Sequence, residues 1–336
     1  MNNARGFLSA GYIPLYGSLG DSEHKVFQGS KIIVITGPTA TGKTELGALL
    51  AKKRNGEVVS ADSMQIYKYM DIGTAKPTED EKLGVPHHMI DIAPPWEDYS
   101  VSRYVSDASL IIDDILRRGK LPVLVGGTGL YIDSLLAGHG FSARGDADMR
   151  RELEAEYDEI GGDAMLLRLR AFDPRSADKL HANDKKRIVR AFEAYAVTGQ
   201  TIFQHDLDAK EQPPRYSAAK FALTYSDRAE LYRRIEQRVD TMFSKGLEGE
   251  ARRLLDMGVR SDSTAMQAIG YKETIGAILG HCSMDDAAGI IKTRSRHYAK
   301  RQLTWLRRDN SIKWYARDSH PSAEMCARAI CEEMPQ

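Results

Sequence analysis

The chain of 336 residues has few cysteines, no long apolar run and no excess of charge of one sign. Its three cysteines, Cys282, Cys326 and Cys331, make neither a C-x-x-C pair nor an even-numbered set, which argues against a zinc site and a disulfide framework. No stretch approaches the roughly 20 apolar residues of a membrane-spanning helix. We therefore expect a cytoplasmic protein with ordinary thiols and no membrane partner.

The charges balance overall but cluster locally. Lysine plus arginine equal aspartate plus glutamate at 47 each, so the net charge gives no sign of a polyanionic partner. Residues 292–308, however, carry seven basic and no acidic side chains, with His297, Tyr298 and Trp305 interleaved, and a second basic cluster lies within residues 185–190. Local basic surfaces of this kind suit a phosphate backbone, although a solvated helix face explains a single run equally well.

The stretch GPTATGKT, residues 37–44, is typical of a phosphate-binding loop. Its two glycines stand where the backbone must turn tightly and approach an anion, and Lys43 and Thr44 open the next helix. The β-branched run KIIVIT before it predicts a buried parallel strand, and TELGALLAKKR after it has helical spacing. This strand-loop-helix context favours phosphate binding over a surface turn, and most chains with such a loop bind ATP or GTP.

Further strands place a carboxylate beside this loop. We predict them at GEVVSAD (56–62), HHMIDI (87–92), LPVLVGG (121–127), KFALTY (220–225) and IKWYA (312–316). Ligands of open α/β sheets lie beyond the carboxyl ends of strands, where Asp62 stands. A carboxylate there can hold Mg²⁺ or accept a proton from a nucleophile. The alternative role for Asp62 is a helix N-cap.

Residues 109–119, SLIIDDILRRG, imitate the acidic strand end that holds the metal of an ATPase. Their spacing instead predicts a helix that ends at Gly119. The apolar residues that repeat at helical spacing are Ala108, Ile111, Ile112, Ile115 and Leu116. The strand that does follow ends in Gly126, Gly127 and Thr128, so the usual second motif of an ATPase is missing where the topology would place it.

We predict an α/β fold in which a P-loop NTPase-like parallel sheet carries a helical insertion domain. Residues 31–140 and 219–336 are expected to form the catalytic core with a helical C-terminal part. Residues 141–218, mostly helical and highly charged, are expected to form the insertion. Residues 1–30 lack the features of a signal peptide and are expected to be a disordered extension or the product of an upstream start.

Several further motifs follow in a fixed order and spacing: GPTATGKT, DSMQIYKYMDIGTAKP, HHMIDI, YSV, LVGGTGLY, NDKKRIVRA, AIGYKE and AKRQLTWLR. Together they resemble the tRNA dimethylallyltransferase family, also called tRNA isopentenyltransferases. The resemblance extends from about Lys31 to Trp314, and the second motif alone is highly specific. Because no Cys/His zinc finger follows, the chain resembles the bacterial members.

The resemblance implies that the dimethylallyl group of dimethylallyl diphosphate is transferred to N6 of the adenosine immediately 3′ of the anticodon in tRNA, with release of diphosphate. The phosphate loop would then hold a prenyl donor. Asp62 is implied as the catalytic base and Thr128 as a second residue on the substrate side. We expect Lys43, and Mg²⁺ on Thr44, to stabilise the leaving group, with Arg234 and Arg238, one helical turn apart, completing the clamp.

The expected site residues form three sets. The donor diphosphate is expected to contact Gly37, Pro38, Thr39, Ala40, Thr41, Gly42, Lys43, Thr44, Arg234 and Arg238. The resemblance implies tRNA contacts at Asp62, Ser63, Met64, Gln65, Thr128, Arg150, Lys186, Arg187, Ile188, Val189, Arg190, Gln267, Gly270, Tyr271, Lys272, Arg294, Arg296, Lys300, Arg301 and Gln302. The catalytic set is Asp62, Thr128, Lys43 and Arg234. We expect a monomer that binds the tRNA anticodon stem-loop.

Other functions fit the same residues less well. A related enzyme class prenylates free adenine nucleotides on this fold, but the helical insertion and the basic C-terminal region favour tRNA, because a mononucleotide needs no such footprint. A P-loop kinase or nucleotide switch requires a strand-end acid that LPVLVGGT lacks. An RNA-binding module with a relict loop leaves Asp62 beside an intact GKT unexplained.

Overall fold

The computed structural model describes residues 30–138 and 147–334. Within these ranges, parallel strands form one sheet in the order β3-β2-β4-β1-β5-β6. The strands are β1 (Ser30–Thr36), β2 (Gly56–Ser60), β3 (His87–His88), β4 (Leu121–Val125), β5 (Tyr216–Thr224) and β6 (Lys313–Ala316). The predicted parallel sheet is therefore confirmed, and each predicted strand is present.

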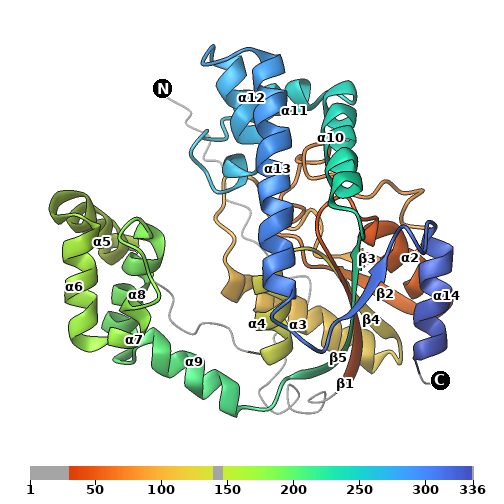
Figure 1. The fold of residues 1–336 in the computed structure, drawn as a ribbon, viewed down its shortest axis with the longest axis horizontal. Coiled ribbons are helices and arrows are strands. Elements are labelled where there is room, and N and C mark those ends of the chain that lie inside the picture. The colour runs from red at the N-terminus through yellow and green to blue at the C-terminus, as the bar shows by residue number, and fades with distance from the viewer. Residues whose placement is uncertain (1–29, 139–146, 335–336) are drawn as a thin grey trace, which may run out of the picture.

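Helices cover both faces of this sheet (Figure 1). They are α2 (Lys43–Lys53), α3 (Val101–Arg117), α4 (Gly129–Ala137), α5 (Ala147–Ile160), α6 (Gly162–Phe172), α7 (Pro174–Ala177), α8 (Lys185–Thr198), α9 (Ile202–Glu211), α10 (Arg228–Ser244), α11 (Leu247–Asp256), α12 (Tyr271–Ile278), α13 (Met284–Leu306) and α14 (Ala323–Glu333). A short 3₁₀ turn spans Ala265–Gln267. None of the helices in the described ranges combines the length and the apolar character needed to cross a membrane.

The core is divided by the sheet because side chains alternate along each strand. On β1, Ile32 and Val34 join the cluster that includes residues of α3 and α4. Ile33 and Ile35 join the cluster that includes residues of α2 and α14 on the opposite face. A strand buried on both faces needs apolar residues at every position, which explains the continuous β-branched run before the phosphate loop.

The segment that imitates an ATPase strand is helical, as predicted. It lies in α3, and Gly119 follows the helix with a φ of 70°. Asp113 is fully buried and accepts hydrogen bonds from Tyr216 Oη at 2.6 Å and Arg215 Nη2 at 2.5 Å. This carboxylate therefore fixes the start of β5 and is not available to a metal at the sheet edge.

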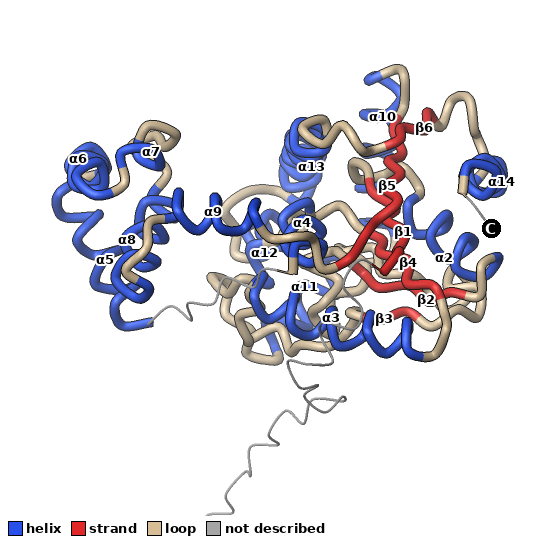
Figure 2. The backbone as a smooth tube through the Cα atoms, turned by 90° about the horizontal axis from the view of Figure 1, so that it is seen from below, coloured by secondary structure: helices blue, strands red, loops and turns tan. Residues whose placement is uncertain are grey.

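Helices α5 to α9 lie to one side of the sheet (Figures 1 and 2). They enclose a small core of their own around Leu169, Ala177 and Ala191. Strand β5 already begins at Tyr216, inside the range predicted for the insertion. The predicted N-terminal extension up to residue 29, and residues 139–146 around the start of the insertion, lie outside the described residues.

Helices α10 to α13 form a group beyond the carboxyl end of β5, and α13 runs from this group down to α4 (Figure 1). The long helix α13 thus lies beside the loop between β4 and α4. The space between this helical group and the carboxyl ends of the central strands contains the candidate site.

Candidate active site

A cavity of about 390 Å³ lies between the phosphate loop, the carboxyl ends of the central strands and helices α10 and α13. Its polar lining includes Lys43 and Thr44 of the phosphate loop, Asp62 and Ser63 after β2, Arg238 of α10, and Tyr298 and Arg301 of α13. Its apolar lining includes Ile235, Val239 and Met242 of α10 and Ile291 of α13. Side chains predicted to serve the donor and the acceptor thus meet in one cavity.

The backbone conformation of the phosphate loop depends on glycine. Gly37 has a φ of 136°, and a Cβ at this position would lie 2.3 Å from the carbonyl oxygen of Leu223. Helix α2 begins directly after the loop, and Lys43 Nζ donates a hydrogen bond of 2.7 Å to the carbonyl oxygen of Pro38. Backbone N–H groups in the first turn of α2 have no helical acceptor, so they are available to an anion.

Lys43 and Arg238 make the cavity electropositive. Both side chains are half-buried by surface area yet closely surrounded by protein atoms, and burial is the main cause that lowers their pKa values. The pKa of Lys43 falls to about 7, because burial and the charge of Arg238 outweigh the opposing effect of Asp62. Two cations therefore face one carboxylate in a poorly hydrated space, an arrangement that favours a polyanionic ligand.

Asp62 uses one carboxylate oxygen to hold the chain. Its Oδ1 accepts hydrogen bonds from the backbone N–H groups of Met64 at 2.9 Å and Gln65 at 3.4 Å. These bonds cap a turn over residues 63–66, so the alternative of a helix N-cap is wrong, although Asp62 does hold the backbone after β2. In the described part of the chain no hydrogen bond to Oδ2 is found, so the second oxygen is free to accept a proton in the cavity. The capping and catalytic roles are therefore compatible.

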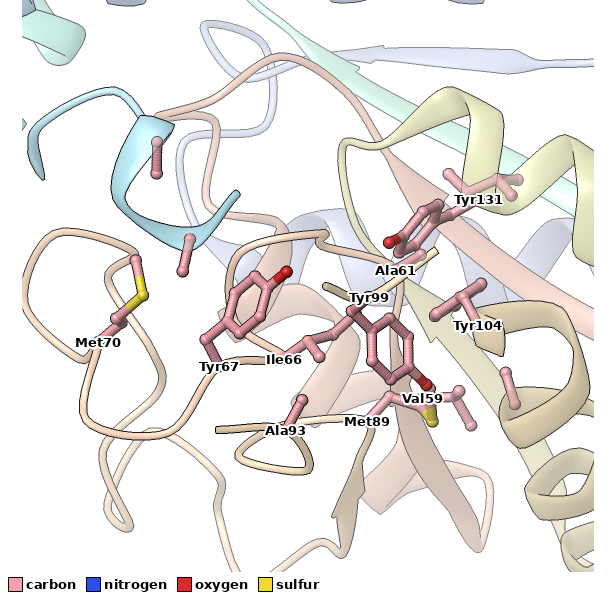
Figure 3. Close-up of a cluster of buried hydrophobic side chains, with 14 of the residues drawn as sticks. Val59, Ala61, Ile66, Tyr67, Met70, Met89, Ala93, Tyr99, Tyr104 and Tyr131 are labelled. Carbon is pink, nitrogen blue, oxygen red and sulfur yellow. The ribbon is translucent and has the colours of Figure 1, made fainter. Parts of the chain in front are cut away.

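A cluster of buried hydrophobic side chains, among them Tyr104 and Tyr131, packs against Val59 and Ala61 at the end of β2 (Figure 3). Tyr104 Oη donates a hydrogen bond of 3.0 Å to the carbonyl oxygen of Ser60, two residues before Asp62. The rings of Tyr104 and Tyr131 stack with centroids 4.1 Å apart. These contacts fix the end of β2, and thereby the point from which Asp62 reaches into the cavity.

Thr128 lies between Ser63, which follows β2, and Tyr298 of α13. Its Oγ1 accepts a hydrogen bond from the backbone N–H of Ser63 at 3.2 Å and donates to Ser63 Oγ at 3.4 Å. Its side chain also lies near the hydroxyl of Tyr298, whose pKa is raised to about 12 by burial and by the charge of Asp62. Thr128 itself does not line the cavity, whereas Ser63 and Tyr298 do.

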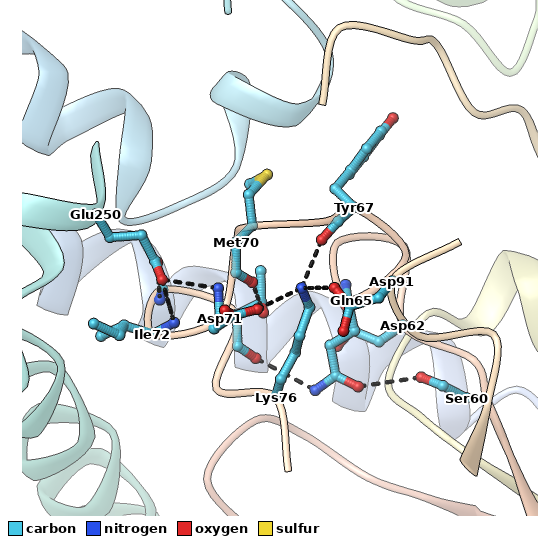
Figure 4. Close-up of polar contacts among 12 residues, drawn as sticks. Ser60, Asp62, Gln65, Tyr67, Met70, Asp71, Ile72, Lys76, Asp91 and Glu250 are labelled. Carbon is cyan, nitrogen blue, oxygen red and sulfur yellow. Dashed lines mark hydrogen bonds and ion pairs between the residues drawn. The ribbon is translucent and has the colours of Figure 1, made fainter. Parts of the chain in front are cut away.

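Glu250 holds the loop that forms one wall of the cavity (Figure 4). This buried carboxylate accepts hydrogen bonds of 2.9–3.1 Å from the backbone N–H groups of Asp71, Ile72 and Gly73, and one from the Tyr271 hydroxyl. The sequence reasoning missed Glu250. It occupies an apolar-face position of α11 together with Leu247, Ala251 and Leu254, and an acid within such a stripe is the signal that would have found it.

Arg234 does not reach the cavity, in contrast to the predicted clamp. Its side chain is 48% exposed and its Nε donates a hydrogen bond of 2.8 Å to Glu230 Oε1, one turn earlier on α10. Arg238 lines the cavity instead, and its Nη2 lies 3.4 Å from the carbonyl oxygen of Thr74. The two arginines therefore differ in location. Arg238 lines the cavity, whereas Arg234 lies outside it and is hydrogen-bonded to Glu230.

The residues predicted to contact tRNA divide by exposure. Those with exposed side chains are Arg150, Lys186, Arg187, Gln267, Lys272, Arg294, Lys300 and Arg301, and Arg190 and Arg296 are half-buried. Ile188, Val189 and Tyr271 are buried in the protein interior, so the structure argues against contact through these side chains. Gly270 is also buried, and its N–H donates to Glu273 Oε2 at 2.8 Å.

Several of the predicted basic residues pair with acids of the protein: Arg294 with the buried Glu273, Arg296 with Glu236, and Arg150 and Arg190 with Glu193. Arg150 and Arg190 donate hydrogen bonds of 2.8–3.0 Å to Glu193, whose side chain is fully buried. Burial alone would raise the pKa of Glu193, but the hydrogen bonds from the two arginines lower it overall. This cluster ties α5 to α8 inside the insertion.

The oxygen ligands near the phosphate loop fit Mg²⁺ only together with a phosphate ligand. Among the described residues no group of three or more Asp, Glu, His or Cys side chains could hold a metal ion. Thr44 lines the same cavity as Asp62. Mg²⁺ retains several waters and takes phosphate oxygens readily, so one protein hydroxyl suffices when a diphosphate supplies further ligands.

Comparison with known protein families decides among the alternatives. The family model described as IPP transferase matches residues 65–309, and one described as isopentenyl transferase matches residues 30–91. The chain belongs to the IPP transferase family. Among the relatives of this family member, the tRNA dimethylallyltransferase of Acetivibrio thermocellus is 46% identical over 87% of this chain and 94% of the relative. That of Carboxydothermus hydrogenoformans is also 46% identical, over 90% and 97%.

Solved structures of IPP transferases share the fold. The full-length tRNA isopentenylpyrophosphate transferase from Bacillus halodurans is 41% identical, with a TM-score of 0.66 over 90% of this chain and 96% of that chain. A eukaryotic dimethylallyltransferase acting on tRNA is 30% identical, with a TM-score of 0.75 over 90% of this chain and 78% of that chain. The predicted P-loop-like α/β fold class is thus confirmed.

Proposed function

We propose that this enzyme transfers the dimethylallyl group of dimethylallyl diphosphate to N6 of the adenosine immediately 3′ of the anticodon in tRNA. In this reaction the bond from the allylic carbon to the diphosphate oxygen breaks, a carbon–nitrogen bond forms, and the amine loses a proton. The observation that carries the proposal is the meeting of Lys43, Arg238 and Asp62 in one cavity of an IPP transferase. The cations suit the leaving diphosphate and the carboxylate suits the amine.

The donor end is the electropositive part of the cavity. The Lys43 ammonium, the Arg238 guanidinium and the N–H groups at the start of α2 would bind the diphosphate and stabilise the charge that grows on it as the bond breaks. Mg²⁺ held by Thr44, when bound, would neutralise further charge on the leaving group. Because these groups are fixed and poorly hydrated, their effect on a developing charge is larger than it would be in water.

The cavity offers an apolar surface for the prenyl group beside these cations. Ile235, Val239 and Met242 line the cavity from the same face of α10 as Arg238, at positions separated by three or four residues. A ligand with an anionic head and a short branched apolar tail matches a stripe that combines one cation with aliphatic side chains. A nucleoside triphosphate has no such tail, so this stripe supports a prenyl donor.

The acceptor end is formed by Asp62 and its neighbours. An exocyclic adenine amine is a weak nucleophile, and Oδ2 of Asp62 would accept its proton as the new bond forms. Ser63 and Tyr298 bring hydroxyl groups into the cavity that Asp62 lines, and Thr128 holds Ser63 through its hydroxyl. The target base must leave its stack to reach this point, which costs least for an unpaired loop nucleotide.

Exposed basic side chains support binding of the anticodon stem-loop. Lys186 and Arg187 lie in the first turn of α8, where the helix dipole already favours an anion. Lys300 and Arg301 are exposed on α13 next to the cavity. Each phosphate contact releases counterions and strengthens binding without reading sequence. A tRNA acceptor also accords with the predicted cytoplasmic location, and the monomeric state stays a prediction.

One experiment tests the proposed reaction. The protein is incubated with dimethylallyl diphosphate labelled in the prenyl group and, in separate reactions, with tRNA, AMP or ATP. We expect label only in tRNA, at the adenosine 3′ of the anticodon, and only in tRNAs that carry an adenosine there. Label in AMP or ATP, with none in tRNA, would replace this proposal by nucleotide prenylation.

A further inference from the structure

Gln302 of α13 makes hydrogen bonds to two loops of the active site at once. Its Oε1 accepts a hydrogen bond of 2.9 Å from the backbone N–H of Thr39, in the phosphate loop. Its Nε2 donates one of 2.9 Å to the carbonyl oxygen of Gly127, directly before Thr128. The side chain is only 6% exposed. Both ends of its amide are therefore engaged inside the protein, which differs from the direct tRNA contact expected from the resemblance.

The loop after β4 is built to let α13 approach. A Cβ on Gly127 would lie 2.2 Å from Gln302 Nε2, and a Cβ on Gly129 would lie 2.4 Å from the Trp305 ring. Trp305, one turn after Gln302, also donates a hydrogen bond of 2.8 Å from Nε1 to Asp133 Oδ2. Helix α13 is thus attached to α4 independently of Gln302, so a change at Gln302 should leave the helix in place.

We propose that Gln302 is a positioning residue that holds the phosphate loop in register with the loop of residues 126–129. This inference rests on the proposed function, because the first loop would hold the donor and the second precedes Thr128 on the acceptor side. Gln302 also lines the cavity, but both polar ends of its amide are bonded to the backbone of the two loops. Its amide sets the separation between the loops, and thereby the distance that the allylic carbon must cover to reach the amine. Small errors in such a distance are costly for a bond-forming step.

Two variants of Gln302 separate bridging from mere polarity. Gln302→Met keeps an unbranched side chain of similar length but removes both hydrogen bonds. Gln302→Asn keeps the amide but is one methylene shorter, so it cannot reach both loops. Gln237→Met, at an exposed glutamine of α10, is the matched control. The measurements are the single-turnover rate at saturating donor and tRNA, the affinity for inorganic diphosphate by calorimetry, the affinity for tRNA, and thermal melting.

We expect both Gln302 variants to lower the single-turnover rate by about 10- to 100-fold and to weaken diphosphate binding several-fold, while tRNA affinity stays within about twofold of the wild type. The control should match the wild type in every measurement. A normal rate at saturation, or a loss confined to tRNA affinity, would overturn the proposal in favour of direct tRNA contact. If Gln302→Met does not fold, Gln302→Asn decides.

The test also distinguishes this inference from the proposed function. If the wild type transfers no label to tRNA, the proposed function fails. The affinity for diphosphate then still tests whether Gln302 holds the phosphate loop. Unchanged diphosphate affinity in both variants would exclude a role in holding the phosphate loop.

Discussion

The cations of the cavity and those of the insertion differ in their partners. In the insertion, Arg150 and Arg190 bind the buried carboxylate of Glu193. In the cavity, no ion pair is found for Lys43 or Arg238 among the described residues, and both have lowered pKa values. A buried cation without a bonded carboxylate destabilises the protein on its own. We therefore assign the two cations of the cavity to ligand binding, whereas the paired cations of the insertion stabilise its structure.

Asp62→Asn should produce the largest effect on the cavity side of this comparison. The amide preserves size and the capping oxygen but cannot accept the proton, so we expect the single-turnover rate to fall by roughly a hundredfold to ten-thousandfold. Melting temperature and tRNA affinity should change little. A variant that turns over at nearly the normal rate would assign Asp62 to structure and move the proton acceptor elsewhere.

Lys43→Met should weaken donor binding by about 10- to 100-fold, because a charged hydrogen-bond donor to the diphosphate is lost. It should also stabilise the ligand-free protein at pH 7. The folded-state pKa of Lys43, about 7, lies below the unfolded value of 10.5, so the unfolded chain binds more protons between these values. The penalty from Lys43 is therefore complete below pH 7 and fades as the pH rises toward 10.5.

Thermal melting of Lys43→Met and of the wild type at pH 7 and pH 10 measures the predicted effect on stability. We expect the variant to melt several degrees higher at pH 7, with a smaller difference at pH 10. A variant that is less stable at pH 7 would show that Lys43 is a structural cation like those of the insertion.

The two arginines of α10 sharpen the comparison within one helix. Arg238→Ala should weaken donor binding by about tenfold, because the guanidinium lines the cavity. Arg234→Ala, at the arginine that pairs with Glu230 in solvent, should stay within about twofold of the wild type. Calorimetry with dimethylallyl diphosphate measures both. Equal losses in the two variants would restore the predicted clamp of Arg234 and Arg238.

The smallest expected effect lies on the insertion. Replacing Lys186 and Arg187 together by alanine should weaken tRNA binding several-fold at moderate salt and reduce the slope of log K against log salt by up to about one unit for each lost contact. Donor affinity should not change. Lys245→Ala, outside the predicted tRNA surface, is the control. A slope equal to that of the wild type would make this cluster a solvated helix face.

Much of the fold could be predicted from the sequence because local patterns determine it. The β-branched runs give the strands of the sheet, and helical spacing separates α3 from a metal-binding strand even though it contains Asp113 and Asp114. The phosphate loop and Asp62 follow from loop chemistry and from the rule that ligands lie at the carboxyl ends of strands.

The features of the site that could not be predicted depend on the direction in which a helical side chain points, or on contacts between distant segments. Residues 186–190 were predicted to contact tRNA as one run, but consecutive residues of a helix face different directions, so Ile188 and Val189 are buried while Lys186 and Arg187 are exposed. Gln302 and Glu250 could not be assigned their roles from the sequence, because the loops that they hold lie more than a hundred residues away along the chain.

The most direct test of the account is the proton balance of donor binding at pH 8. With Lys43 largely neutral in the free protein, binding of dimethylallyl diphosphate should draw close to one proton from the buffer, and affinity should weaken as the pH rises above 7. Calorimetry in buffers of different ionisation enthalpy measures this uptake. Lys43→Arg, whose cation stays charged, should bind the donor without it. An uptake near zero in the wild type, or an equal uptake in Lys43→Arg, would contradict the claim that Lys43 holds the diphosphate.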